Sequence, residues 1–496
     1  MDSDRPGQPR SAREETAPLF RVLSQGQRER IHDAALTLLV DPGIQVTTEE
    51  GRSVLAAAGC DMEGEIARIP ARLVDEAISS APKTFTLYDR SGRECMFLGE
   101  GRTYFGTGVT SLFYQNPETN EVHDFTLEDM ADVARLTDAL EGLDFLSTPG
   151  VVRPTDDMPI QLVNHFEYLN MVSNTTKPLL LLTADGDSLA DIVEMAALIA
   201  GGREELRKRP SISAYLNSVT PLMFNIETLD KLLICADAGI PVTSQSAPNV
   251  GATTPVTVAG TTALACAETL AGLVITQARQ PGTPYMAGTM PMVMDMRTGE
   301  VTGGGSPGHL TYLAGVEMAH HWGLPQVGAG GSTDSKIPDE QAAKDVASGV
   351  LADILEGVDM SFDAGAMEMG LTHSAVLMTI VSDVILETRG MLRGVPTDDE
   401  SLAIDVTREV GIGGHFLGSP HTLEHFRELE TPGLTDWSSR RDWEAAGSTS
   451  LRQRAEKLTL ELIANHEVEP LPAGVLKEMR EVIERRRAKL PPEEDD

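Results

Sequence analysis

Cysteine pairs and basic residues are scarce in this 496-residue chain, and each scarcity excludes a class of protein. The four cysteines, at positions 60, 95, 235 and 266, include no CxxC or CxC pair. This spacing argues against a disulfide framework and against a zinc site with the usual ligand spacing, so we expect no metal. No apolar run follows Met1, so we expect no signal peptide and a cytoplasmic protein.

Basic residues are also few, and this limits the kinds of molecule that the protein is expected to bind. The chain has 75 acidic and 40 basic residues, giving a net charge of −35, and only nine of the basic residues are lysines. Nucleic acid and anionic membrane both present negative charge, so we expect neither as a partner. Such acidity also resembles proteins from a high-salt cytoplasm, which is one hypothesis for its origin. The apolar stretch 257–276 is interrupted by Glu268, so it predicts a buried helix instead of a membrane span.

Several catalytic signatures are missing from the sequence. No GxxxxGK[ST] or HExxH motif occurs, no GxGxxG turn follows an early strand, and the GxSxG spacing at 304–308 does not directly follow a predicted strand, as a nucleophile elbow requires. These absences argue against a triad hydrolase, a phosphate-cradling loop, a zinc protease and a dinucleotide-binding fold.

Short apolar runs alternate with helix-length patterns through most of the chain, which predicts an α/β fold with a parallel sheet. The predicted strands are 145–152, 178–183, 211–216, 241–245, 285–288, 325–330 and 359–362. The predicted helices between and after them are 160–172, 189–199, 225–238, 257–278, 308–322, 339–357 and 375–392, with 127–140 ahead of the first strand. We expect a TIM-type (β/α)8 barrel, with a doubly wound sheet as the alternative. The eighth strand is either 104–106 or beyond the helix 375–392.

The rest of the chain predicts smaller units around this fold. Residues 1–18 are polar and predict a disordered arm. Residues 19–125 predict an N-terminal cap of three helices (24–40, 48–58 and 70–80) followed by an antiparallel meander. The barrel would span 126–395. Residues 396–496 would form a Gly/His-rich loop, two helices (448–465 and 473–490) packed on the barrel, and an acidic tail.

Charged side chains follow three successive strands, where sites of such folds lie. Asp295 and Arg297 follow one strand, Asp334 and Lys336 the next, and Asp363 and Glu368 the third. Only about 4% of residues are aromatic, yet several stand near strand ends or in the cap. Rings of this kind can recognise a quaternary ammonium group, although each is also a candidate for the core.

Three sequence motifs resemble the trimethylamine methyltransferase family: DMRTGEVTGGGSPGH (295–309), GGSTDSKIPDEQAA (330–343) and GIGGHFL…HTLEHF (411–426). The resemblance implies a TIM-type barrel with a cavity at the strand ends. It also implies transfer of a methyl group from a methylated amine to a corrinoid (cobalamin) carried by a partner protein, with no cofactor bound tightly here. The founding members carry pyrrolysine near the position of Gly330 and Gly331. This chain has only standard residues and so resembles the non-pyrrolysine branch, which implies glycine betaine or a related quaternary amine.

On this reading, residues can be assigned to roles as hypotheses. The residues Tyr104, Phe105, Tyr215 and Phe362 would surround the trimethylammonium group. One of Asp295, Asp334 and Asp363 would offset its charge, and Arg297, Lys336 or His373 would bind a substrate carboxylate. Small side chains at Gly330 and Gly331 would leave room for the substrate. The loop with His415, His421 and His425 would face the corrinoid protein or cap the barrel.

Other functions stay open at this point. They are a trimethylamine-type methyltransferase, a metal-assisted barrel lyase or aldolase, and a catalytically silent amine-binding protein. We also expect a homo-oligomer.

Overall fold

The computed structural model describes residues 20–303, 305–429 and 433–490. The predicted arm at 1–18 and the last residues of the acidic tail lie outside these ranges. Within them, strands and helices alternate as the sequence predicts, and the predicted α/β class is confirmed.

Eight parallel strands form the centre of the molecule. They are β6 (Tyr104–Thr107), β9 (Leu146–Ser147), β10 (Leu179–Leu181), β11 (Ile212–Asn217), β13 (Val242–Gln245), β15 (Tyr285–Met286), β18 (Val327–Gly328) and β19 (Met360–Ala364). One parallel sheet has the order β9-β10-β11-β13-β15, and another has the order β18-β19-β6. Single parallel bridges link the two sheets at both edges, Gly106 with Phe145 and Ala287 with Gln326. All seven predicted strands are present, and β6 provides the eighth.

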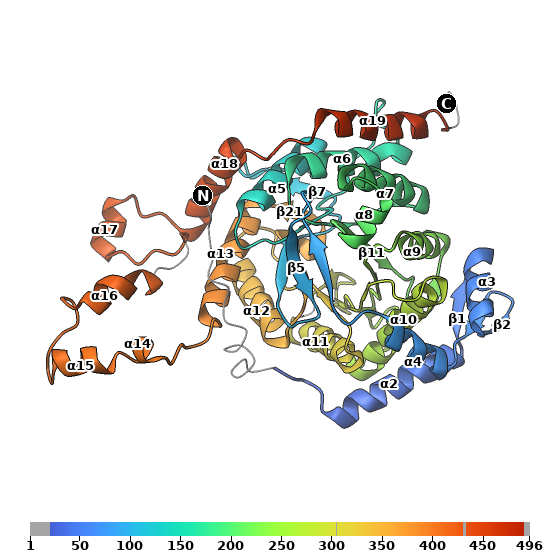
Figure 1. Ribbon diagram of the computed structural model, residues 1–496, viewed down its shortest axis with the longest axis horizontal. Helices are drawn as coiled ribbons and strands as arrows, with labels where there is room; N and C mark the ends of the chain where they lie inside the picture. The colour runs from blue at the N-terminus through green and yellow to red at the C-terminus, as the bar shows by residue number, and fades with distance from the viewer. Residues whose placement is uncertain (1–19, 304, 430–432, 491–496) are drawn as a thin grey trace.

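Helices connect these strands and surround them (Figure 1). They are α5 (Leu127–Ala139), α6 (Val163–Asn174), α7 (Gly186–Ala200), α8 (Arg203–Lys208), α9 (Ile226–Ala238), α10 (Val258–Arg279), α11 (Gly305–Trp322), α12 (Glu340–Glu356) and α13 (Ala375–Met391). Local sequence explains where many of them begin and end. The side chains of Asp185, Asn225 and Asp339, for example, each accept a backbone N–H of the first turn. Gly239 and Gly357 end their helices with a positive φ that costs glycine little.

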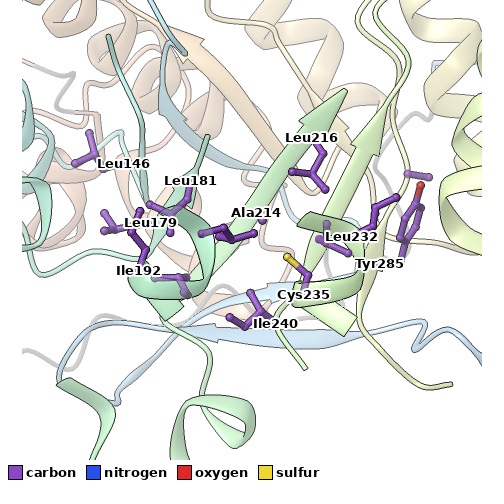
Figure 2. Packing of buried hydrophobic residues seen from close by; sticks show 14 of the residues in the cluster. Leu146, Leu179, Leu181, Ile192, Ala214, Leu216, Leu232, Cys235, Ile240 and Tyr285 are labelled. Carbon is purple, nitrogen blue, oxygen red and sulfur yellow. The ribbon is translucent and has the colours of Figure 1, made fainter. Parts of the chain in front are cut away.

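The two faces of the strands are buried in different clusters. Outward side chains of β10 and β11, such as Leu179 and Leu216, lie in a cluster with Ile192 of α7 and Leu232 of α9 (Figure 2). The alternate residues point the other way and join an inner cluster that includes Leu180, Tyr215, Met286 and Phe362. This period of two places alternate strand residues on opposite faces of the sheets, each in its own cluster.

Helix α10 is the one helix of the described residues that is long and apolar enough to cross a membrane. The fold buries 83% of its most apolar window, and the helix packs against α2 (Gln25–Val40) and α4 (Ala71–Ser80). It is a core helix, as the sequence predicts.

The N-terminal part contains the three predicted helices, α2, α3 (Glu49–Ala58) and α4. Small strands β1 (Ile44–Val46), β2 (Asp61–Glu63) and β3 (Ile66–Arg68) accompany them, and β1 also pairs with β12 (Met223–Phe224).

The predicted single meander is wrong, because its strands pair with different partners. Strands β4 (Phe85–Tyr88) and β5 (Glu94–Leu98) form a hairpin, whereas β6 joins the central parallel strands. Strands β7 (Phe113–Gln115) and β8 (Val122–Asp124) pair with each other and, through β7, with β21 (Thr372–Ser374), which pairs with β20 (Ala366–Met367). Apolar alternation identifies a strand but not its partner, which is fixed by distant residues.

The C-terminal part divides into two regions. Helices α18 (Leu451–Asn465) and α19 (Ala473–Arg487) pack on α13 and α7, as predicted. Between α13 and α18, four short helices lie away from the rest of the molecule (Figure 1): α14 (Asp399–Leu402), α15 (Ile404–Val410), α16 (Pro420–His425) and α17 (Arg440–Ala445). The domain boundaries at residues 125 and 395 stay predictions.

Candidate functional site

The carboxyl end of β19 places an acidic side chain inside the protein. The register with β6 shifts between Ser361 and Ala364, and Asp363 in this bulge has a φ of 77°, which is rare outside glycine. Asp363 is only 4% exposed. Strained backbone that persists in a buried strand is typical of functional sites, so this position is a candidate.

Two aromatic rings lie beside this bulge. Tyr215 of β11 and Phe362 of β19 meet edge to face, with ring centroids 5.4 Å apart and an interplanar angle of 86°. Both rings are buried in the inner cluster. Burial raises the pKa of Tyr215, and the charge of Asp363 raises it further.

The Asp363 carboxyl group has no counter-ion among the residues that the structure describes. No cationic side chain among the described residues forms an ion pair with it. Burial raises its pKa to about 7, the backbone N–H of Val109 lowers it, and the neighbouring Asp353 raises it further. Asp353 is itself buried and is hydrogen-bonded by Ser361 Oγ (2.5 Å) and Tyr312 Oη (2.6 Å). A buried carboxylate that no cation neutralises favours binding of a cationic ligand.

The sequence-based reasoning missed polar groups on the neighbouring strand β13. Thr243 and Gln245 pair in register with Tyr215 and Asn217, so they face the same side of the sheet. Gln245 is 1% exposed, and its Nε2 donates to the Val327 carbonyl at 3.4 Å. The sequence did contain a signal for Gln245, because a polar residue at the end of a buried strand is unusual outside a functional site.

Apolar side chains complete the surroundings of the Tyr215–Phe362 pair. Four partly buried residues pack against the inner cluster near the strand ends: Val109, Leu182, Met290 and Ala329. The group formed by Tyr215, Phe362 and Asp363 is called the carboxylate–ring cluster below. It offers one negative charge and two π faces in apolar surroundings.

Tyr104 and Phe105 do not join this cluster. Tyr104 is the first residue of β6, at the amino end, and its hydroxyl accepts the backbone N–H of Phe97 at 3.0 Å. Phe105 points outward, where the Arg389 guanidinium lies 5.5 Å from its ring centroid. The sequence could not distinguish these positions, because the register of β6 is set by β19.

The predicted charged residues of the first two loops lie at the surface. Asp295 and Arg297 form an ion pair at 2.9 Å in the turn between β16 (Met292–Met294) and β17 (Val301–Thr302), and Arg297 is 88% exposed. Asp334 accepts the Gly303 N–H at 3.0 Å, and Lys336 donates to the Asp334 carbonyl at 2.8 Å. These contacts hold loops together, and the structure does not bring the four residues to Asp363.

His373 is buried with its ring against Gly365, two residues after Asp363. It lies on β21, stacked on Tyr114 with centroids 6.3 Å apart, and Phe125 meets it edge to face. Burial lowers the pKa of His373 to about 3, so the ring is neutral and cannot act as a cation for a substrate carboxylate.

The histidines at 415, 421 and 425 lie far along the chain in the projecting region and do not cap the strands (Figure 1). His421 and His425 have ring centroids 4.3 Å apart. Ligand atoms of Glu400, Glu424 and His425 lie within 4.8 Å of one another, but both glutamates are exposed, where such groups are common without an ion.

The space beside Gly330 and Gly331 is filled by other parts of the chain. A Cβ at Gly330 would lie 2.5 Å from Asp353 Oδ2, and one at Gly331 would lie 2.6 Å from the backbone nitrogen of Ala364. These glycines let the loop after β18 approach β19 and α12 closely. The structure therefore does not show the free space predicted there.

We expect Gly331→Ala to destabilise the protein. Its Cβ would meet backbone atoms of β19 that cannot rotate away, and overpacking of this kind typically costs about 1–3 kcal/mol. Gly390→Ala in α13 is the matched control, because nothing lies within 4 Å of a Cβ there. Thermal unfolding should show a lower midpoint for the first variant and an equal or higher midpoint for the second. Equal midpoints for Gly331→Ala and the unsubstituted chain would contradict the close approach.

An α/β fold with a buried acidic group at the carboxyl ends of parallel strands is typical of an enzyme. The family model described as trimethylamine methyltransferase (MTTB) matches residues 3–491, so the chain belongs to this family and is a methyltransferase.

Relatives cover nearly the whole chain. The trimethylamine methyltransferase MttB of Desulfitobacterium hafniense is 32% identical over 92% of this chain and 91% of its own. The corresponding MttB1 of Methanosarcina acetivorans is 33% identical, covering 94% of each chain. The glycine betaine methyltransferase of Desulfitobacterium hafniense is 29% identical over 90% of this chain and 93% of its own.

A solved structure, the monomethylamine methyltransferase MtmB of Methanosarcina barkeri, covers 92% of this chain and 97% of its own. Its identity is 12% and its TM-score 0.48, a likeness too distant to carry an argument.

Proposed function

We propose that the chain removes a methyl group from a quaternary amine that is held by the carboxylate–ring cluster. The observation that carries this proposal is Asp363, a buried carboxylate without a cationic partner among the described residues, beside the rings of Tyr215 and Phe362. Each ring contributes about 0.5–2 kcal/mol to binding of a cation, most when water is excluded. Glycine betaine or a related betaine is the proposed substrate, supported by the relative named glycine betaine methyltransferase.

We propose further that the eight parallel strands form a TIM-type (β/α)8 barrel. Each strand pairs with the next, and the two single bridges connect the remaining edges. The carboxylate–ring cluster then lies inside the carboxyl end, the usual position of a barrel active site. The predicted parts 19–125, 126–395 and 396–496 would be its cap, barrel and C-terminal extension.

The proposed acceptor is the cobalt(I) corrinoid of a partner protein, because the family resemblance implies such a partner. Cobalt(I) is a strong nucleophile, so the chain needs to supply no nucleophile of its own. The C–N bond breaks with its electron pair on nitrogen, which leaves a neutral tertiary amine, and the methyl group passes to the cobalt. The chain's residues orient the methyl group and exclude water.

The charge of the cluster matters most before the transfer. Asp363 would balance the ammonium cation in the bound substrate, and the positive charge on nitrogen disappears as the bond breaks. The apolar side chains around the rings favour this loss of charge, because they solvate a neutral amine better than a cation. The nitrogen of a quaternary amine already carries a positive charge, so a neutral tertiary amine leaves from it without further activation. This is consistent with a site built only from standard residues.

A zwitterionic substrate requires its carboxylate to point away from Asp363. Two unit charges about 4 Å apart repel by roughly 4 kcal/mol near a protein surface. Arg297 and Lys336, which the sequence assigns to that carboxylate, are both exposed in outer loops. Substrates with a longer arm between ammonium and carboxylate therefore fit the proposal better than compact ones.

The test combines the purified protein, a cobalt(I) corrinoid and a panel of quaternary amines that includes glycine betaine, longer betaines and choline. We expect the corrinoid spectrum to report methylation with at least one of them. Trimethylamine in the same panel tests the founding activity. Calorimetric binding without methyl transfer would indicate a silent amine-binding protein, and neither binding nor transfer with any amine would refute the proposal.

Binding should depend on pH through Asp363. Its folded pKa of about 7 lies above its ordinary value, so the carboxyl group is neutral below pH 7 and anionic above it. A cation binds the anionic form, so affinity should rise with pH, level off above pH 8, and fall about tenfold per unit below pH 6. Calorimetry in buffers of different ionisation enthalpy should show almost one proton released at pH 6. An affinity independent of pH between 5 and 8 would contradict this role.

A further inference from the structure

Two polar side chains of β13 lie on the face of the sheet that carries the inner cluster. Thr243 pairs in register with Tyr215 on one side and with Met286 on the other, and both of these residues belong to that cluster. Gln245 follows two positions later on the same strand, so its side chain points to the same face. Thr243 is fully buried and Gln245 is 1% exposed. The carboxylate–ring cluster therefore has polar neighbours on the strand beside Tyr215.

The Gln245 amide is held in one orientation. Its Nε2 donates to the Val327 carbonyl at 3.4 Å and would lie 2.6 Å from a Cβ at Gly288, so the amide crosses a position that has no side chain. The reverse orientation would set the amide oxygen against the Val327 carbonyl oxygen, and neither of these atoms can donate. The Oε1 of Gln245 is therefore the atom left free.

Two buried polar atoms of this strand have no hydrogen-bond partner among the residues that the structure describes. They are Gln245 Oε1 and Thr243 Oγ1. Buried polar atoms are nearly always hydrogen-bonded, so both of them need a partner that is not a residue of the described chain. That partner is either water or a ligand of the neighbouring carboxylate–ring cluster.

The chemistry of these two atoms selects a ligand group. An amide oxygen only accepts hydrogen bonds, whereas a threonine hydroxyl can also donate one. A hydroxyl group on the ligand matches both, because it can donate to Gln245 Oε1 and accept from Thr243 Oγ1. A carboxylate only accepts, so it would set oxygen against Gln245 Oε1, and the ionised Asp363 would repel it as well.

We propose that Gln245 and Thr243 form a hydroxyl subsite, so that the preferred substrates are quaternary amines that carry a hydroxyl group. This inference rests on the proposed function, because the carboxylate–ring cluster would hold the ammonium end of the same molecule. Neighbouring strands lie about 4.8 Å apart, a distance that a short carbon arm between nitrogen and hydroxyl can span. Glycine betaine has no hydroxyl group and would leave both polar atoms unpaired, so a hydroxylated betaine would bind more tightly.

Gln326 provides a matched comparison, because it has a similar amide on the opposite face. Its Oε1 is also buried without a hydrogen-bond partner in the described chain, and its Nε2 donates to the Leu324 carbonyl at 2.9 Å. Gln326 directly precedes Val327, which belongs to the inner cluster, so its side chain points the other way. There, Nδ1 of His320 on α11 lies 3.0 Å from its Nε2. An unpaired amide oxygen on this face is not beside the carboxylate–ring cluster.

The test compares choline with n-propyltrimethylammonium, in which a methyl group replaces the hydroxyl group. Calorimetry on the unsubstituted chain should show that choline binds about tenfold more tightly, because the other cation leaves both polar atoms unpaired. Gln245→Met keeps the length of the side chain and removes its acceptor, and Thr243→Val keeps the shape and removes the hydroxyl. Each substitution should shrink the difference between the two cations, and the double substitution should abolish it. Gln326→Met should keep the full difference.

The outcomes separate this inference from the proposed function. If neither cation binds the unsubstituted chain, the proposed function fails and the subsite fails with it. If both bind with equal affinity, the proposed function stands and the hydroxyl subsite is overturned, because water then satisfies the two atoms. This comparison needs no variant, so it is decisive even if a substitution prevents folding. A difference that survives in the double variant, or that disappears in Gln326→Met, also overturns the subsite.

Trimethylamine tests the other donor that Gln245 Oε1 can receive. In its protonated form it carries an N–H group, which tetramethylammonium lacks. We expect tetramethylammonium to bind at least as tightly at pH 8, both in the unsubstituted chain and in Gln245→Met. A preference for protonated trimethylamine that Gln245→Met abolishes would overturn the inference, because Gln245 would then bind the ammonium group itself.

Discussion

Asp363→Asn should lower kcat/KM for the methylated amine at least a hundredfold. The substitution removes the one buried charge that faces the ammonium group. Breaking a buried charge pair costs about 3–5 kcal/mol, and every 1.4 kcal/mol is tenfold. Asparagine tolerates the left-handed backbone that this position requires, so the change tests charge without adding strain. The measurement is the rate of methyl transfer to the corrinoid at pH 8, where the carboxyl group is ionised.

Asp295→Asn is the matched comparison for that prediction. Its carboxylate lies in a surface turn and pairs with Arg297, and surface ion pairs contribute only about 0–1 kcal/mol. We expect rates within about threefold of the unsubstituted chain. A loss at Asp295 as large as that at Asp363 would place the substrate in the outer loop. Thermal unfolding should show that Asp363→Asn is at least as stable at pH 8, because it removes a carboxylate whose ionisation burial opposes.

The double substitution Tyr215→Leu/Phe362→Leu should weaken binding of the quaternary amine by roughly five- to a thousandfold. Leucine keeps most of the apolar volume but removes both π faces, each worth about 0.5–2 kcal/mol to a cation. The effect should fall mainly on the dissociation constant, because the carboxylate remains. Calorimetry with the tightest ligand of the panel provides the measurement.

Phe105→Leu is the control for ring removal. Its ring lies outside the strands, against Arg389, so the substitution should change stability and leave the dissociation constant unaltered. Weakened binding in Phe105→Leu, or unchanged binding in Tyr215→Leu/Phe362→Leu, would show that the rings are not the recognition element.

Much of the fold could be predicted from the sequence because its local signals agree with one another. Each predicted strand between 145 and 362 is an apolar run that ends in a turn, and several of the following helices carry a recognisable cap such as Asp185 or Asn225. The pairing of β6 and β7 could not be predicted, because their partners β19 and β21 are more than 200 residues away.

The site could be predicted only in part, for the same reason. The sequence favoured Asp295, Asp334 and Asp363 equally, because each of them follows a predicted strand. Only their burial in the fold distinguishes them. The bulge that gives Asp363 its φ of 77° arises from the register with β6 and has no signature in the local sequence. Tyr215 and Phe362 lie on strands far apart in the chain, and their contact at 5.4 Å required the fold.

The central claim concerns where the ammonium group binds. A crystal structure of the protein with its tightest quaternary amine tests it most directly. The nitrogen should lie within about 6 Å of the ring centroids of Tyr215 and Phe362, the distance typical of cation–π contacts, with the Asp363 carboxylate beside it. An amine bound at the surface turn of Asp295 and Arg297, or anywhere away from Asp363, would contradict the account.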